Sequence, residues 1–505
     1  MGCGPSAGAQ VFNLRCDPFG QSYAETAFSV EVNEDGNYVV AAGAGFDDGQ
    51  YFYSSIVTSV VVDQNGQVIS VDSVWYPQHA TYAGWSNSMD KRADGGFVIG
   101  GNTFRTKTIG NWISRAALFM IGPNGSVEGL TEIGPKNQSW IGRQAKQTPD
   151  GGYVICGETS GVGNALQTFV IKTDAQGNEE WLQTYGGQWN DSCKSIEPRS
   201  SGGYFLGGQY RITSSNRQIW LAALELTGAV AWIKTWGGAF EDFSAHAIEL
   251  ADGHILVAGG LGYGNNGPYR CYLAKLDSSD GTFIWQKEYD ALLPEGLFHV
   301  AQEIEPGGDL IAGGYGLSGS SYYGSLLRTT STGDSLWMRQ YQYHDSLVSN
   351  GRGLFRDVVP TPDGGFIAVG TALQAGPYTQ DVWVVKVDSM GCLEPGCHLI
   401  QGMETQITNL RDALTVAPNP VVQGGSVHVH LELPENFTPQ GALRLTLVSS
   451  DGRVVHEKVI AVTGHSARSE GVPLSLDRTR MPAGLYHLHV SDDTRWISGA
   501  KLVVE

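Results

Sequence analysis

The sequence predicts an all-β fold: a seven-bladed β-propeller followed by a small immunoglobulin-like β-sandwich. An Asp-Gly type of turn followed by apolar residues occurs seven times before residue 400, at spacings of 51 to 59 residues. Glycine accounts for 68 of 505 residues and aromatic residues for 10%, which suits many short strands joined by tight turns. After residue 414 the composition changes, because six of the twelve histidines lie there.

Each copy of the repeat predicts four strands. An alternating strand precedes the first turn, and a strand ending in small residues follows it. A third strand, a second glycine turn and a fourth strand that often carries tryptophan complete the copy. The first turns contain Gly36, Gly95, Gly151, Gly202, Gly253, Gly307 and Gly364, and the second turns contain Gly66, Gly125, Gly177, Gly228, Gly281, Gly333 and Gly391. A single four-stranded sheet cannot bury both of its faces, so seven copies at this period indicate a closed propeller.

The two ends of the repeat region predict how the ring closes. The seventh copy ends at Gly391, where its fourth strand should begin, and residues 11–16 supply an apolar strand to fill that place. The propeller is therefore expected over residues 11–399. The Pro-Gly turn between Cys392 and Cys397 favours a local disulfide, although Cys16 would lie close enough to leave the pairing open.

The repeats resemble a widespread group of secreted bacterial propellers with Asp-Gly-Gly-Tyr units and Lys-x-Asp-x-x-Gly turns. The latter occur here as Lys172-Thr173-Asp174, Lys275-Leu276-Asp277 and Lys386-Val387-Asp388. The resemblance covers residues 11–399 and implies the fold but no particular ligand.

Residues 400–413 form a polar linker, and residues 414–505 alternate in short apolar strands and turns, which predicts the β-sandwich. The motifs of this tail, in their order along the chain, resemble those of the type A C-terminal sorting domain of the type IX secretion system. The matching residues are Pro418, Asn419, Pro420, Asp451, Gly452, Gly484, Tyr486, Lys501, Leu502, Val503 and Val504. The Gly499-Ala500-Lys501 step departs slightly from the usual Gly-Lys ending. The resemblance implies export by that machinery, normally with removal of the tail, to the outer-membrane surface or the medium.

Charge and the first residues agree with an extracellular location. Residues 1–10 are interpreted as the remnant of a signal peptide, because Ala7-Gly8-Ala9 looks like a cleavage site. The net charge of −19 argues against nucleic acid or an anionic membrane as a partner. No run of about 20 apolar residues is present, so no transmembrane segment is expected.

Candidate binding residues lie at the predicted pore mouth and in long loops. The side chains at the start of the inner strands differ between copies. Such variety is typical of a binding surface and also of unconstrained loops. Aromatic residues occupy the long loops. These candidates are Glu25, Asp191, Asp242, His299, Arg356, Tyr51, Tyr53 and Trp112. Motifs for a serine nucleophile, a zinc peptidase, a phosphate loop or a dinucleotide site are missing, so no catalytic residue and no cofactor is predicted.

Two histidine pairs in the tail pose a separate question. His428 and His430 alternate on one strand, and His487 and His489 alternate on another. Four imidazoles on neighbouring strands could bind zinc or nickel. Polar residues on an exposed sheet face are the plainer interpretation, so no metal is predicted.

Together these features predict a secreted, non-enzymatic binding or adhesion module for a glycan, a peptide or a surface protein. Two alternatives stay open: a structural subunit of an extracellular assembly, and a secreted hydrolase or lyase acting on polysaccharide or peptide.

Overall fold

The structure is a computed structural model of the 505-residue chain. It describes residues 11–18, 24–46, 54–74, 76, 79–108, 111–160, 165–213, 216–264, 269–289, 295–318, 321–344, 352–373, 380–393, 397, 406–410, 413–433, 439, 441–449, 453–460, 472–475, 481–492 and 495–505. The first ten residues, with the expected signal-peptide remnant and Cys3, lie outside this part of the chain.

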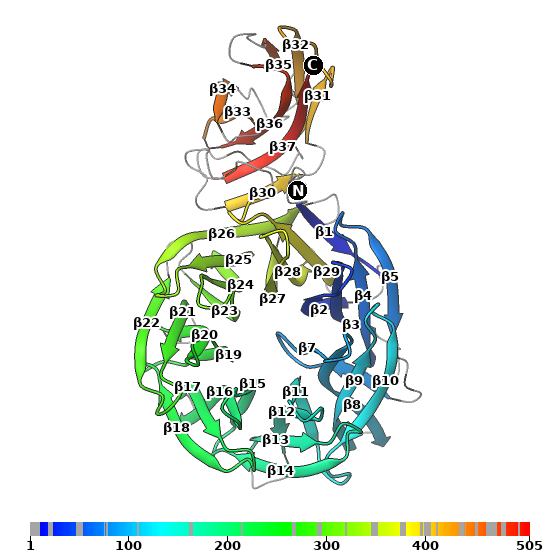
Figure 1. Ribbon diagram of the computed structural model, residues 1–505, viewed down its shortest axis with the longest axis vertical. Coiled ribbons are helices and arrows are strands. Elements are labelled where there is room, and N and C mark those ends of the chain that lie inside the picture. Colours follow the sequence, from blue (N-terminus) through cyan, green and yellow to red (C-terminus); the bar gives the residue numbers. More distant parts are fainter. Residues whose placement is uncertain are drawn as a thin grey trace, which may run out of the picture.

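The described residues form a β-propeller, in which antiparallel sheets succeed one another around a ring (Figure 1). From the inner to the outer edge, the first four sheets contain β2 (Ala24–Val32), β3 (Tyr38–Phe46), β4 (Ser54–Val62) and β5 (Val68–Ser73); β6 (Ala80–Ala83) with β7 (Met89–Lys91), β8 (Phe97–Thr108), β9 (Asn111–Ile121) and β10 (Val127–Ile133); β11 (Trp140–Gln147), β12 (Tyr153–Thr159), β13 (Gln167–Thr173) and β14 (Glu179–Tyr185); and β15 (Ser192–Pro198), β16 (Tyr204–Thr213), β17 (Asn216–Leu224) and β18 (Val230–Trp236).

The next three sheets complete the ring. They contain β19 (Phe243–Glu249), β20 (Ile255–Gly262), β21 (Tyr269–Leu276) and β22 (Phe283–Tyr289); β23 (Glu295–Glu303), β24 (Leu310–Ser318), β25 (Ser321–Thr329) and β26 (Ser335–His344); and β27 (Arg352–Pro360), β28 (Phe366–Leu373), β29 (Gln380–Val387) and β1 (Phe12–Cys16). The N-terminal strand β1 pairs antiparallel with β29, from Phe12 opposite Lys386 to Cys16 opposite Val382, as predicted.

Repeated lysine and aspartate residues hold the first turns of several sheets. At the first turn of the third sheet, the Asp150 Oδ1 accepts a hydrogen bond from the Gly152 N–H, and the Lys172 Nζ lies 2.9 Å from the Asp150 Oδ2. The last sheet repeats this pair, with the Lys386 Nζ 2.9 Å from the Asp363 Oδ2. The lysine of the Lys-x-Asp motif thus stabilises the first turn of its sheet, which explains its recurrence without any ligand.

The repeated tryptophans join neighbouring sheets. The Trp285 ring of β22 lies against Gly333, in the second turn of the next sheet, at 2.9 Å from where a Cβ atom would stand. The Tyr289 hydroxyl donates to the Gly333 carbonyl at 2.6 Å. Trp181 with Tyr185 on Gly228, and Trp337 with Tyr341 on Gly391, repeat both contacts. These second-turn glycines have φ between 71° and 79°, so backbone conformation and close packing both require glycine.

The tail consists of β30 (Gln406–Leu410), β31 (Leu414–Ala417), β32 (Ser426–Leu431), β33 (Leu443–Ser449), β34 (Val454–Ile460), β35 (Val472–Ser475), β36 (Gly484–Ser491) and β37 (Arg495–Val504). One sheet contains β31, β32 and β35, and a separate hydrophobic core, including Val427, Leu445 and Leu488, fills the tail. The other sheet is continuous with the propeller, because β30 pairs in parallel with both β26 and β37 (Figure 1). Trp496 belongs to the core cluster of the last two propeller sheets.

Two disulfides are present in the described residues. The Cys392–Cys397 bond is confirmed. The second joins Cys156 of β12 to Cys193 of β15 and so links two neighbouring sheets, a pairing that the sequence left open. Cys16 and Cys271 are buried thiols. No helix that could cross a membrane occurs among the described residues.

Candidate functional site

A β-bulge at one fixed place distinguishes six of the inner strands. The register shifts between Ala27 and Ser29, Gly142 and Gln144, Cys193 and Ser195, Ser244 and His246, Phe298 and Val300, and Phe355 and Asp357. The residue in each bulge stands eight positions before the first glycine of its repeat: Phe28, Arg143, Lys194, Ala245, His299 and Arg356. A bulge re-aims the side chain that it carries, so this position can differ in chemistry while the blade stays constant.

In the second copy the same position is Asn87, and it closes the centre of the ring. Asn87 lies in the turn between β6 and β7, which reaches toward the axis (Figure 1), with φ of 52°. Its Oδ1 accepts hydrogen bonds from Gln144 Nε2 at 2.8 Å and His246 Nε2 at 3.1 Å, and its Nδ2 donates to Asp357 at 3.2 Å. These partners belong to three other sheets, so a buried polar network spans the axis and separates the two mouths of the channel.

The mouth at the beginning of the inner strands, hereafter the loop mouth, gathers three cations around one indole. The Arg356 Cζ lies 4.2 Å from the Trp85 ring centroid, the Lys194 Nζ 5.4 Å and the Arg143 Cζ 5.8 Å. The three cations come from β27, β15 and β11, and each occupies the bulge position. Cation–π contact favours this arrangement, but it does not neutralise three positive charges.

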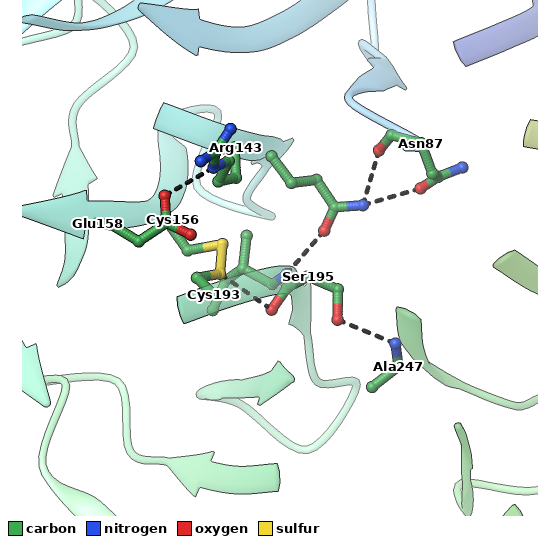
Figure 2. Close-up of a disulfide and its surroundings, with 9 residues drawn as sticks. Asn87, Arg143, Cys156, Glu158, Cys193, Ser195 and Ala247 are labelled. Carbon is green, nitrogen blue, oxygen red and sulfur yellow. Dashed lines mark hydrogen bonds and ion pairs between the residues drawn. A yellow bond between two sulfur atoms is a disulfide. The ribbon is translucent and has the colours of Figure 1, made fainter. Parts of the chain in front are cut away.

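Only one of these cations has an anionic partner in the described part of the chain. The Arg143 Nε donates to the Glu158 Oε2 at 2.6 Å, and this pair lies beside the Cys156–Cys193 disulfide (Figure 2). Lys194 is only 9% exposed, and its closest ring contacts are Trp85 and Phe243, at 5.2 Å for the latter. Among the described residues, this cluster of three cations therefore has only one paired carboxylate.

Burial and mutual repulsion shift the titration of these groups. Burial, together with Arg143, Arg217 and Arg356, lowers the pKa of Lys194 to about 8 against the opposing effect of Glu158. Burial lowers the pKa of Arg356 to about 10. Burial and then the Arg356 and Lys194 charges lower the pKa of His299 well below its usual value, so this imidazole is neutral.

His299 also stands apart in its contacts. It is 3% exposed, and neither ring nitrogen has a hydrogen-bond partner within the described residues. Its ring centroid lies 6.1 Å from that of Phe243 and 5.7 Å from that of Tyr315. A buried polar group without a partner is costly, so an unpaired imidazole beside two unpaired cations marks a place where a ligand can supply missing interactions.

The opposite mouth, beside the first turns, holds carboxyl groups around a lysine. A cavity of about 600 Å³ there is lined by residues including Asp90, Lys146 and Glu197. The Lys146 Nζ lies 3.1 Å from the Asp90 Oδ1 and 3.8 Å from the Glu197 Oε2. Burial raises the pKa of Glu31 to about 8 and that of Glu197 to about 7. Lys146 thus lies among several carboxyl groups, and other basic side chains also line the cavity.

The structure divides the predicted binding residues into two groups. His299 and Arg356 lie at the loop mouth. Asp191 and Asp242 instead cap the backbone: Asp191 accepts from the Gly187 and Arg211 N–H groups, and Asp242 from the Gly238 and Gly262 N–H groups. Burial raises the pKa of Asp242 to about 6. These two aspartates hold loops in place.

Among the other predicted binding residues, only Glu25 has a described side chain. Glu25 lies with Asp17 and Asp381 in a group of carboxylates beside the closing strand β1, where the Arg15 Nη1 is 3.0 Å from the Asp381 Oδ2. Tyr51 and Tyr53 fall outside the described residues. Trp112 pairs with Thr106 in the β8–β9 hairpin, and its side chain lies outside the described part.

The four tail histidines do not form a common site. His428 and His430 are exposed on β32, as expected, but His487 and His489 are buried on β36, which belongs to the other sheet. His489 accepts a hydrogen bond at Nδ1 from the Trp496 indole at 3.0 Å. The expectation that all four imidazoles share an exposed face is therefore corrected, because the second pair lies on a covered face.

The motif residues at the two ends of the tail are in contact. The Asn419 Nδ2 donates to the Lys501 carbonyl at 2.7 Å, and the Val503 N–H donates to the Asn419 Oδ1 at 2.9 Å. The Tyr486 hydroxyl donates to the Pro482 carbonyl, and Leu502 and Val504 are buried in the tail core. Asp451 and Gly452 fall outside the described residues.

Sequence reasoning missed Arg143, Lys194, Asn87 and Trp85. A signal for the first three was present, since all stand eight residues before a repeat glycine. Trp85 lies in the irregular turn that interrupts the inner strand of the second sheet, where no repeat position predicts it.

Comparisons with known proteins add the following. No protein-family model matches the chain, and no curated protein matches it. Among solved structures, it is similar to a Dyadobacter fermentans protein of unknown function at 11% identity, covering 76% of this chain and 100% of that one with a TM-score of 0.45. A Lactobacillus plantarum protein is similar at 11% identity, with 73% and 98% covered and a TM-score of 0.40. The β-propeller domain of the Trilobed protease from Pyrococcus furiosus is similar at 9% identity, with 74% and 96% covered and a TM-score of 0.41. These likenesses are too distant to assign a function.

Proposed function

We propose that this protein is a secreted cell-surface binding or adhesion module, a seven-bladed propeller with an immunoglobulin-like sorting tail, and that it binds its ligand at the loop mouth without catalysing a reaction. The observation that carries the proposal is the convergence of Arg143, Lys194 and Arg356 on Trp85 above a closed axis. Such a surface offers charge and aromatic faces from three rigid strands, which is what a preformed binding site requires.

Three carboxylates near this mouth have structural partners, which favours binding over hydrolysis. Glu158 pairs with Arg143, Asp242 accepts from two backbone N–H groups, and Asp357 accepts from the Ser29 hydroxyl and Asn87. A glycoside hydrolase would need two carboxyl groups facing a shared substrate. Among the described residues of the loop mouth, these groups serve packing instead.

Export through the type IX secretion system is supported by the motif resemblance and by chemistry. The Asn419 contacts to Lys501 and Val503 tie the opening motif of the tail to its last strand. Two disulfides suit a protein that matures in an oxidising compartment.

A role as a subunit of an extracellular assembly is the second candidate, and one observation favours it. The tail shares a sheet with the propeller through β30, and Trp496 packs in a propeller core cluster. These contacts favour a mature protein from which the tail is not removed, as expected for a subunit of an assembly.

The binding proposal is tested with the full chain on a glycan and peptide array. We expect reproducible binding that is lost in Trp85→Ala and kept in Leu226→Ala, a control at an exposed position on a turn. Hits that do not depend on Trp85 would move the site elsewhere. A folded protein that binds nothing would favour the assembly subunit.

Export is tested separately with the full chain behind a signal peptide, produced in matched bacterial strains with and without a working type IX system. We expect the protein on the surface or in the medium only when the system works. Equal release from both strains would contradict the proposed route.

A further inference from the structure

Resting on the proposed function, the geometry points to a more specific ligand: the loop mouth binds one carboxylate group of an acidic sugar, held by Arg143, Lys194 and Arg356. Nothing in the comparisons assigns this site.

The first step is convergence. Three basic side chains from three different sheets have their charged groups within 6 Å of a single indole centroid. Side chains so placed by bulges on rigid strands are ordered before a ligand arrives, which lowers the entropic cost of binding. Guanidinium groups present planar pairs of N–H donors that match a carboxylate, and an ammonium group adds a point charge.

The second step is charge balance. Glu158 accompanies Arg143, whereas Lys194 and Arg356 form no ion pair within the described residues. Lys194 is about nine-tenths buried at 9% exposure, and an unpaired buried cation is unfavourable. One bound carboxylate would give both groups the partner that the described residues do not supply.

The third step is access. Trp85, Arg143 and Arg356 are partly exposed, so solvent reaches the cluster. On the axial side, Asn87 and His246 close the ring. A ligand group can therefore enter from one side and reach no further than Asn87 and His246. This suits a terminal group or a side group of the ligand and excludes a polymer threaded through the channel.

The fourth step selects the kind of anion. Phe243 contacts Lys194 and lies edge-on to His299, and Tyr269 and Tyr315 extend the aromatic surface next to it. Aromatic faces beside a few polar groups suit the apolar face of a sugar ring. The net charge of −19 repels densely charged polyanions at long range, so a ligand with isolated acidic groups is favoured.

Titration calorimetry on the full chain tests the inference with four probes. They are digalacturonic acid, the neutral disaccharide lactose, sodium sulfate, and the acidic tripeptide Gly-Glu-Gly. We expect digalacturonic acid to bind at least tenfold more tightly than each of the others. Tighter binding of the tripeptide would replace the sugar with a peptide, and binding of sulfate alone would reduce the site to one for small inorganic anions. Equal binding of the acidic and neutral sugars would overturn the role of the carboxylate.

Variants identify the site. Lys194→Met and Arg356→Met should each weaken digalacturonic acid binding at least tenfold. Lys287→Met, which removes a partly exposed lysine paired with Asp334, should leave it unchanged. Because Lys194→Met removes an unpaired buried charge, its melting temperature should not fall. Unchanged affinity in a folded Lys194→Met variant would overturn the inference. If array ligands depend on Trp85 but are all neutral, this inference fails while the proposed function stands; if no probe or array ligand binds, both fail.

Discussion

Asn87 and His246 are hydrogen-bonded across the middle of the ring, with the His246 Nε2 3.1 Å from the Asn87 Oδ1. The carboxamide oxygen can only accept, so this imidazole nitrogen carries the proton. Burial lowers the pKa of His246 to about 3, which keeps the ring neutral at physiological pH. The Asn87 side chain thus joins sheets that are far apart in the sequence.

Replacing Asn87 by alanine should destabilise the propeller. The change leaves the buried Gln144, His246 and Asp357 groups without a shared partner and puts alanine at a φ of 52°. We expect a loss of about 2–4 kcal/mol. Thermal unfolding followed by circular dichroism measures it, with the exposed Asn178→Ala as the control. Equal melting temperatures in the two variants would show that the network contributes little.

Ligand affinity should depend on pH through Lys194. The group faces Glu158, Arg143, Arg217 and Arg356, and its pKa of about 8 is low because of burial and the three arginines. A bound anion favours the charged form and raises that pKa, so binding near pH 8 takes up a proton. Affinity should fall as the pH rises above 8, by about tenfold or more when the charge is lost.

Calorimetry at pH 8 in two buffers of different ionisation enthalpy measures this proton uptake. Lys194→Met should show no uptake and a flat affinity between pH 7 and 9 (about one unit on either side of the transition). An unchanged uptake in that variant would assign the proton to another group.

Two glycines with similar backbone conformation should respond differently to alanine. Gly151 and Gly333 have φ of 83° and 77°, but only Gly333 would place its Cβ against a tryptophan, 2.9 Å from a Trp285 ring atom. Gly151→Ala should cost about 1–2 kcal/mol for the positive φ alone. Gly333→Ala should cost about 1–3 kcal/mol more, because the Trp285 contact must open. Paired melting curves give the difference, and equal losses would show that the ring adapts freely.

Removing the Cys156–Cys193 disulfide should lower stability and loosen the loop mouth. The bond closes a loop with a separation of 37 residues, for which the chain-entropy model gives about 3–4 kcal/mol. Cys193 directly precedes Lys194 in the bulge, so the double Cys→Ala variant should also bind digalacturonic acid more weakly. Chemical unfolding measures the stability, and calorimetry measures the affinity. As a comparison, the double variant is also measured after its remaining Cys392–Cys397 bond has been reduced. Unchanged affinity would show that packing alone positions Lys194.

Much of the architecture could be predicted from the sequence, because the turns are specified locally. The positive φ of Gly36 and the other turn glycines, and the aspartates that bond the following N–H groups, recur at a readable period. The apolar strand at residues 12–16 had only one unpaired sheet edge to fill, beside β29. The Cys156–Cys193 bond was not predictable, since it depends on how two sheets face each other.

The candidate site was only half predictable. The residues chosen at the start of the inner strands came from two registers: Glu25, Asp191 and Asp242 stand eleven residues before a repeat glycine, whereas His299 and Arg356 stand eight before it. Only the second register carries the bulge. In the tail, the alternation on β36 indicated which side chains share a face but not that both faces of that strand are covered.

The pairing of β1 with β29 has a consequence for the order in which the protein matures. Phe12 lies opposite Lys386, so β1 stays without its neighbour until the last sheet of the ring has been made. Until that moment the ring is an open arc with two unsatisfied edges, and closure is a late, long-range step. The ribosome delivers the chain from its N-terminus and must release nearly four hundred residues before the ring can close.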